Sequence, residues 1–126
     1  MEQATAVIPA DQAAIRRALL DVLALPSWNE AFLSIDGPEQ PAVGVRYALR
    51  VRPGLNGHLE YTAIEPDRIE ITWRVPGFHE TGTWILGPDQ QVTHSFTHTG
   101  PLAAVLRSAY RGIAAVRLDR LATQVR

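Results

Sequence analysis

The segment QVTHSFTHTG, residues 91–100, contains His94 and His98, two of the four histidines of the chain. On a helix, a spacing of four residues would place both imidazoles on one face, as in a zinc site. The surrounding threonine, serine and phenylalanine residues favour a strand instead. On a strand the two histidines also share a face, with Phe96 between them. We therefore predict that residues 90–99 form a strand.

Strand geometry argues against a metal site at these histidines. At a rise of about 3.3 Å per residue, His94 and His98 would lie about 13 Å apart. A single zinc ion needs ligand nitrogens about 2 Å away from it. The segment also lacks the glutamate of the HExxH pattern. We therefore expect neither a metal nor a cofactor.

Apolar residues also alternate with polar ones earlier in the chain, before residue 91. In residues 45–52 the apolar positions are Val45, Tyr47, Leu49 and Val51, and residues 69–75 repeat the same period of two. Such a period predicts half-buried strands. Turn signals separate the runs at Pro53-Gly54, Pro66-Asp67, Pro76-Gly77 and Gly87-Pro88-Asp89. Turns this short join antiparallel neighbours, so we predict a meander of about six strands between residues 33 and 99.

A helical pattern follows Gly100-Pro101. Apolar residues with a period of 3.6 predict one long amphipathic helix that runs to near the C-terminus. Its apolar stripe consists of Leu102, Val105, Leu106, Ala109, Ile113 and Val116. Gly112 lies in the middle of this helix, where glycine costs about 1 kcal/mol relative to alanine. We expect it to allow a close approach of the sheet or of a ligand.

The N-terminal third predicts a strand and two short helices. Residues 2–8 favour a strand, and Asp11 is a candidate N-cap for the helix that follows. Pro26 ends this helix, and a short second helix follows from Ser27 to Phe32. The order of strand, two helices, meander and long helix predicts an α+β domain in which the last helix covers one face of the sheet.

The composition excludes several classes of protein. The chain has 126 residues, 46% hydrophobic and 20% charged, which suits a single globular domain over residues 1–126. Its formal charge of −1, with thirteen acidic residues among twelve arginines, does not indicate nucleic-acid binding. Without cysteine or lysine it has no disulfides, thiolate nucleophile or Schiff-base lysine. The N-terminus is not typical of a signal peptide, and no apolar run reaches 18 residues, so we expect a cytoplasmic protein without a membrane span, as monomer or homodimer.

Three segments resemble a known superfamily: LPSWNEAF, PGFHETGTWILGP and VTHSFTHTGPLAAVL. With the order of elements, they are similar to the START-like, or SRPBCC, superfamily, in particular its small bacterial members of the polyketide cyclase/dehydrase type. In those members, a Pro-x-Trp-Asn segment lies in the short second helix, where this chain has Ser27-Trp28-Asn29. A segment like THxExFxGLL joins their last strand to the final helix, where this chain has residues 93–102. The acidic residue of that pattern is missing here, and His98 is not a usual feature of the family.

The resemblance implies a helix-grip fold. In this fold, a curved antiparallel sheet of about seven strands wraps around a long C-terminal helix, and two short helices follow the first strand. It also implies a hydrophobic ligand cavity between the sheet and the final helix. It does not imply a particular reaction, because chemistry depends on the site rather than on the fold.

Three titratable residues are candidates for the inner face of the sheet. His94 and His98 share the parity of Val92 and Phe96, so they are either proton-transfer groups on a cavity wall or hydrogen-bonded core histidines. His98, next to Gly100-Pro101, is expected near the cavity mouth. Glu80 has the parity of Trp84; if it points inward its pKa would be raised and it could act as a base, and otherwise it is a solvated strand residue.

A set of aromatic residues is expected to line one concave surface. Tyrosine and tryptophan bring a polar atom into an apolar wall, which suits a polycyclic or acyl ligand, although each residue alone could be plain core. The candidate ligand-binding residues are Tyr47, Tyr61, Trp73, Trp84, Phe96, His98 and Tyr110. Trp28 is expected to be structural, as an anchor of the short helix.

Three functions remain open at this point. The first is the binding of a small hydrophobic molecule, polycyclic, acyl or lipid-like, between the sheet and the last helix. The second is a polyketide aromatase/cyclase or dehydratase, in which His94 or Glu80, with Tyr61 or Tyr110, moves protons. The third is a stress-response or protein-interaction role without a ligand.

Overall fold

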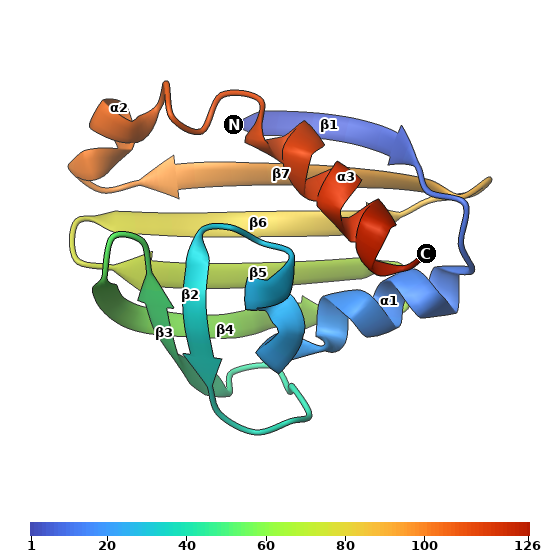
Figure 1. The fold of residues 1–126 in the computed structure, drawn as a ribbon, viewed down its shortest axis with the longest axis horizontal. Coiled ribbons are helices and arrows are strands. Elements are labelled where there is room, and N and C mark those ends of the chain that lie inside the picture. Colours follow the sequence, from blue (N-terminus) through green and yellow to red (C-terminus); the bar gives the residue numbers. More distant parts are fainter.

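The fold is one curved sheet with helices packed over its concave face (Figure 1). The computed structural model describes residues 1–126, the whole sequence. Seven antiparallel strands are ordered β1-β7-β6-β5-β4-β3-β2. They are β1 (Glu2–Val7), β2 (Phe32–Asp36), β3 (Arg46–Val51), β4 (Leu55–Ile64), β5 (Arg68–Val75), β6 (Phe78–Leu86) and β7 (Gln91–Thr99). The predicted α+β helix-grip architecture and its strand meander are confirmed.

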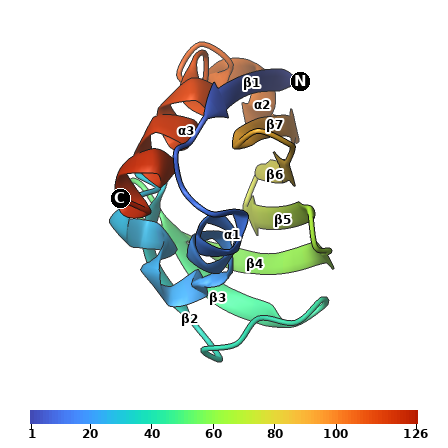
Figure 2. The same cartoon turned by 90° about the vertical axis from the view of Figure 1, so that its right-hand side faces the viewer.

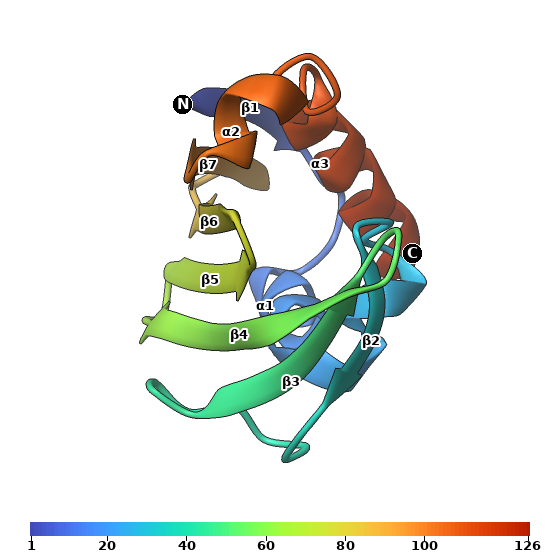
Figure 3. The ribbon, with the colours of Figure 1, turned by 90° about the vertical axis from the view of Figure 1, so that its left-hand side faces the viewer.

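The helices lie on the concave face of the sheet. Helix α1 (Gln12–Leu20) and a 3-10 helix, η1 (Val22–Ser27), follow β1, so the predicted order of one strand and two helices is confirmed. The predicted second helix from Ser27 to Phe32 is wrong in its position, because Pro26 lies inside η1, which ends at Ser27, and Phe32 begins β2. Figures 2 and 3 show the sheet curling around α1, with the last helix, α3 (Ile113–Gln124), closing the open side. None of the helices is long and apolar enough to cross a membrane.

The predicted long C-terminal helix is divided into two pieces. A short helix, α2 (Leu102–Leu106), is separated from α3 by a turn that ends at Gly112. Gly112 has a φ of +82°, in the left-handed region that favours glycine, and a Cβ added there would meet nothing within 4 Å. The expectation that Gly112 allows a close approach is therefore wrong. Its backbone conformation, not its small size, explains the glycine.

The start of α3 is capped by a residue from the other end of the chain. Both carboxylate oxygens of Glu2 accept hydrogen bonds from backbone N–H groups, one from Gly112 at 2.8 Å and one from Ala114 at 2.7 Å. Helix N-terminal N–H groups lack partners within the helix and carry partial positive charge, so a carboxylate stabilises them. Strand β1 thus fixes where α3 begins.

The new start of α3 also changes which of its residues face the sheet. The buried positions are Ala114, Arg117, Leu118 and Leu121, a helical face with spacings of three and four. Val116, which the predicted stripe placed inside, is 41% exposed, and Val105 is 74% exposed. The stripe predicted from one continuous helix is therefore wrong in its phase, and an arginine lies on the inner face instead.

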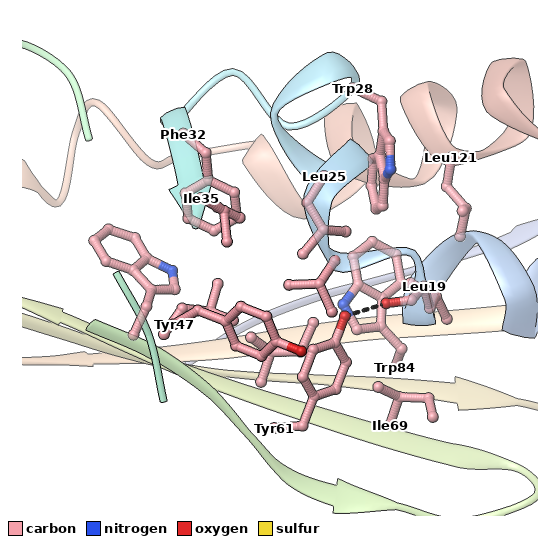
Figure 4. Packing of buried hydrophobic residues seen from close by; sticks show 14 of the residues in the cluster. Leu19, Leu25, Trp28, Phe32, Ile35, Tyr47, Tyr61, Ile69, Trp84 and Leu121 are labelled. Carbon is pink, nitrogen blue, oxygen red and sulfur yellow. Dashed lines mark hydrogen bonds between the residues drawn. The ribbon is translucent and has the colours of Figure 1, made fainter. Parts of the chain in front are cut away.

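Aromatic side chains fill much of the core between the layers (Figure 4). Trp28 and Trp84 pack edge to face, with ring centroids 5.7 Å apart, and so do Phe32 and Trp73. At the α1 end, Tyr61 donates a short hydrogen bond to the carbonyl oxygen of Leu19. The core therefore leaves little internal space, which bears directly on where a ligand could bind.

Candidate functional site

The candidate site is a buried polar cluster where β5, β6 and β7 face α3. Its members are Trp73 on β5, Glu80 on β6, His94 and His98 on β7, and Arg117 on α3. Strand alternation brings the first four to the concave face. In the register, Glu80 lies opposite both Trp73 and His98, and Trp84 lies opposite His94. The cluster is thus assembled by pairing across three adjacent strands.

Glu80 is the centre of this cluster. Arg117 donates two hydrogen bonds to it, from Nη1 to Oε2 at 2.9 Å and from Nη2 to Oε1 at 3.0 Å. Trp73 Nε1–H donates to Oε2 at 2.9 Å, and His98 Nε2 lies 2.8 Å from Oε1. A carboxylate only accepts hydrogen bonds, so His98 Nε2 carries the proton of that bond. Four hydrogen bonds therefore hold Glu80 as an anion.

The environment of Glu80 lowers its pKa. Burial alone would raise the pKa of this carboxyl group, but the charge of Arg117 and the hydrogen bonds from His98 and Arg117 lower it to about 2. Of the two sequence-based alternatives, the structure has Glu80 pointing inward, only 3% exposed. The expected rise in pKa is wrong, because Arg117 and His98 together outweigh the effect of burial.

His94 is held in one tautomer. The carbonyl oxygen of Thr83, 3.0 Å from His94 Nδ1, can only accept, so Nδ1 carries the proton. His94 Nε2 then accepts from Arg117 Nη1 at 3.3 Å. Burial and the Arg117 charge lower the pKa of His94 to about 4, against the opposing effects of Glu80 and Thr83. His94 is therefore a neutral core histidine, stacked on Trp84 with ring centroids 3.7 Å apart.

Tyr110, in the turn between α2 and α3, packs against the other end of the cluster. Its ring stacks on Phe78 and meets the His98 ring edge to face, with a centroid distance of 4.4 Å. Burial and the nearby Glu80 charge raise the pKa of its hydroxyl, against the charge of Arg117. Tyr110 is thus neutral and presents a phenol beside His98.

The space around the cluster is divided into small parts. An inner cavity of about 20 Å³ is lined by Trp28, Asn29, Trp73, Glu80, His94 and Arg117, among others. A surface hollow of about 230 Å³ shares Trp28, Asn29 and Arg117 with that cavity and opens between residues 28–31 and α3. A second hollow, of about 310 Å³, is bordered by Glu2, Phe96, His98, Arg107, Tyr110 and Arg111. The structure therefore has these separate spaces in place of the single large cavity that the resemblance implied, because the tryptophan side chains fill the interior.

The predicted ligand-binding residues fall into three groups. Trp73 and Trp84 line the inner cavity, and Phe96, His98 and Tyr110 border the 310 Å³ hollow. Tyr47 and Tyr61 are fully buried and line none of these spaces, because they pack at the α1 end of the core. The structure therefore brings together His94, Glu80 and His98 but separates them from these two tyrosines.

Sequence reasoning missed Arg117 and Asn29 and treated Trp28 as structural. Asn29 is buried, and its Oδ1 accepts a hydrogen bond from Ala31 N–H at 3.1 Å. The Trp28-Asn29 pair was visible in the sequence as part of the family-like segment. Arg117 could have been found only from a helix beginning at Gly112, which places residue 117 on the same face as Ala114 and Leu121.

Comparison with known proteins identifies the family and the fold. Residues 3–126 match the family described as polyketide cyclase/dehydrase and lipid transport. No curated protein matches the sequence. A Streptomyces aromatase/cyclase, Zhui, has a similar structure, with a TM-score of 0.74, 15% identity and coverage of 98% of this chain and 92% of that one.

Two further solved structures resemble this fold. A START superfamily protein from Mycobacterium smegmatis has a TM-score of 0.68 and 18% identity, covering 98% of this chain and 95% of that one. A major latex-like protein from Panax ginseng has a TM-score of 0.74 and 13% identity, covering 99% and 96%. At these identities the likeness concerns the fold alone.

Proposed function

Because the chain belongs to the polyketide cyclase/dehydrase and lipid transport family, we propose that it binds a small hydrophobic molecule between residues 28–31 and α3. The proposed binding site is the hollow of about 230 Å³ that shares Trp28, Asn29 and Arg117 with the inner cavity. One observation carries the proposal: this largely apolar hollow is lined by Arg117, whose guanidinium group is paired with buried Glu80. Apolar walls with a few fixed polar groups are typical of small-molecule sites.

The size of the hollow limits the ligand. Its volume lies slightly below the usual range of about 300–1,000 Å³ for ligand pockets. We therefore expect a bicyclic or short-chain molecule rather than a long lipid. Ile113, Val116 and Tyr110 form the outer wall, and Arg120, paired with Glu30, lies at the rim.

Filling the hollow tests this proposal. Ala109 lines it and is exposed, so Ala109→Trp places an indole there without disturbing the core. Val105→Trp is the matched control, because Val105 is 74% exposed and lines neither the hollow nor the inner cavity. Calorimetric titration with 2-acetylnaphthalene should show binding to the wild type and to V105W but not to A109W. Equal binding by all three proteins would contradict the proposed site.

A second candidate function is proton transfer, favoured by the Glu80–His98 hydrogen bond. His98 borders the 310 Å³ hollow, and Glu80 orients its imidazole through Nε2. Among the groups expected from the sequence, Glu80 is held as an anion by Arg117, and both ring nitrogens of His94 are occupied. His98, with Tyr110, is therefore the better placed proton-transfer group for a cyclase or dehydratase.

The proton-abstraction probe 5-nitrobenzisoxazole tests this second function. A base in an apolar site should accelerate its ring opening, and His98→Gln should remove the acceleration. His79→Gln is the control, since His79 lines neither this hollow nor the inner cavity. If H98Q and the wild type reacted at the same rate, His98 would not be the base. We do not propose the third role, because an interaction module has no use for a buried polar cluster beside a hollow.

A further inference from the structure

Two buried hydrogen-bond donors of the candidate site have no partner in the protein. They are Nε1–H of Trp28 and Nε–H of Arg117, and both side chains are only 4% exposed. The remaining unpartnered buried atoms, Tyr47 Oη and His79 Nε2, belong to residues that line neither the hollow nor the inner cavity. Leaving a buried donor unpaired costs free energy, so such groups are rare and need an explanation.

Both donors belong to residues that line the hollow and the inner cavity alike. Trp28 and Arg117 line the 230 Å³ hollow and also the 20 Å³ cavity behind it. The two terminal nitrogens of Arg117 are occupied by Glu80, and Nη1 also by His94. Nε is therefore the only nitrogen of the Arg117 guanidinium group without a hydrogen-bond partner in the protein.

The chemistry of the two donors defines what they can bind. An indole N–H and a guanidinium N–H only donate, so their partner must be an acceptor. A cavity of about 20 Å³ has room for one oxygen-sized atom. A carbonyl oxygen has two lone pairs and can accept from both donors at once.

The charges that line the inner cavity favour a neutral acceptor over an anion. Glu80 lines the same cavity and already neutralises Arg117 through two hydrogen bonds. A second carboxylate there would face the Glu80 charge in a buried setting. A ketone or ester oxygen avoids that repulsion.

We infer that the ligand is a hydrophobic molecule bearing a neutral carbonyl group, which enters the inner cavity oxygen first and accepts hydrogen bonds from Trp28 and Arg117. This inference rests on the proposed function, since it names the chemical class of ligand for the same hollow. Trp28 is then a ligand-binding residue as well as an anchor of the core.

Three naphthalene probes of nearly equal size test the inference. They are 2-acetylnaphthalene, which has a ketone, 2-ethylnaphthalene, which has no oxygen, and 2-naphthoate, which is an anion. The wild type should bind the ketone about 2- to 10-fold more tightly than the hydrocarbon, the range of one net hydrogen bond. The naphthoate should bind more weakly than the ketone.

Trp28→Phe keeps an aromatic ring and removes the indole donor, together with part of the volume of the side chain. In W28F the preference for the ketone should decrease, while the affinity for 2-ethylnaphthalene should stay within about twofold of the wild type. Tyr47→Phe is the control, because it removes another unpartnered buried polar group at a residue that lines neither the hollow nor the inner cavity, and it should keep the ketone preference. NMR of the wild type gives an independent readout: the ketone, but not the hydrocarbon, should shift the Trp28 indole proton downfield.

Several results would overturn the inference. Equal wild-type affinities for ketone and hydrocarbon would mean that the donors face only solvent water, and the proposed hydrophobic site would still stand. If 2-naphthoate bound more tightly than the ketone, the inference that the ligand is neutral would be wrong. If W28F lost affinity for the ketone and the hydrocarbon equally, Trp28 would contribute to packing alone and not to a hydrogen bond. If the wild type bound no probe, the proposed function would fail together with this inference.

Discussion

Glu80 and Arg117 form a two-hydrogen-bond ion pair between β6 and α3, with N–O distances of 2.9 and 3.0 Å and both side chains 4% exposed. Thirty-seven residues separate them in the sequence. The pair joins the sheet to the last helix, α3, which packs on its concave side. Arg117 also lowers the pKa of both Glu80 and His94, which line the inner cavity with it.

Removing one partner of this pair should strongly destabilise the protein. Glu80→Gln leaves the Arg117 charge buried without a counter-ion, and Arg117→Met does the same to Glu80. Each should lower the free energy of unfolding by about 3–5 kcal/mol. The double variant should lose less than the sum of the two, because neither charge remains unpaired. Urea denaturation measures all three.

The exposed pair of Arg68 and Glu70 provides the control. Its N–O distance is 2.6 Å, but the side chains are 37% and 22% exposed. Glu70→Gln should therefore change the free energy of unfolding by less than about 1 kcal/mol. A similar loss in E70Q and E80Q would contradict the special role of the buried pair.

The lowered pKa of His94 makes stability depend on pH. Its folded pKa of about 4 lies below the ordinary histidine value of 6.5, so between these values the unfolded state binds a proton that the folded state does not. Stability from His94 is complete above pH 6.5 and is lost as the pH falls toward 4, by about 3 kcal/mol in total. Glu80, with a pKa of about 2 instead of 4.5, adds a further loss between pH 4.5 and 2.

His94→Gln should flatten the pH dependence between pH 6.5 and 4. Glutamine retains one donor and one acceptor for Thr83 and Arg117 but does not titrate. His79, whose pKa is also lowered by burial and by Arg74, contributes with the same sign, so His79→Gln is the comparison. If thermal denaturation showed the wild-type slope unchanged in H94Q, the assignment of the slope to His94 would be wrong.

The cap formed by Glu2 should be measurable. Glu2→Ala removes the acceptor of the Gly112 and Ala114 N–H groups and should lower the free energy of unfolding by about 1 kcal/mol. Glu39→Ala, at an exposed position outside the helices and strands, should change it by less than about 0.5 kcal/mol. Indistinguishable stabilities of the two variants would show that Glu2 is not a cap.

The left-handed conformation of Gly112 predicts an ordered series of substitutions. Alanine at a φ of +82° should cost about 1–2 kcal/mol, although a Cβ there meets nothing within 4 Å. Asparagine tolerates this conformation better, so Gly112→Asn should be less destabilising than Gly112→Ala. Chemical denaturation of both variants tests the order, and the reverse order would contradict the backbone explanation.

The sheet could be predicted from the sequence because its signals are local. Alternation in residues 45–52 and 69–75 sets the buried face of each strand, and turn residues mark where the strands end. The same alternation placed His94 and His98 on the inner face, where the structure has them. These assignments need no knowledge of distant contacts.

The site could not be predicted to the same extent because its properties depend on α3. The apolar pattern ran through residue 112 without a break, so the phase of the last helix was wrong and Arg117 was missed. Without Arg117, burial predicts a raised pKa for Glu80 rather than a lowered one. The volume of the cavity depends likewise on how four aromatic rings from distant segments pack together.

The most direct test of the account is the position of a bound ligand. A crystal structure with 2-acetylnaphthalene should show the rings between Ala31 and Val116, and the ketone oxygen within hydrogen-bond distance of Trp28 Nε1 and Arg117 Nε. A probe found only outside this hollow, with the space between residues 28–31 and α3 closed to it, would contradict the central claim that the hollow is the binding site.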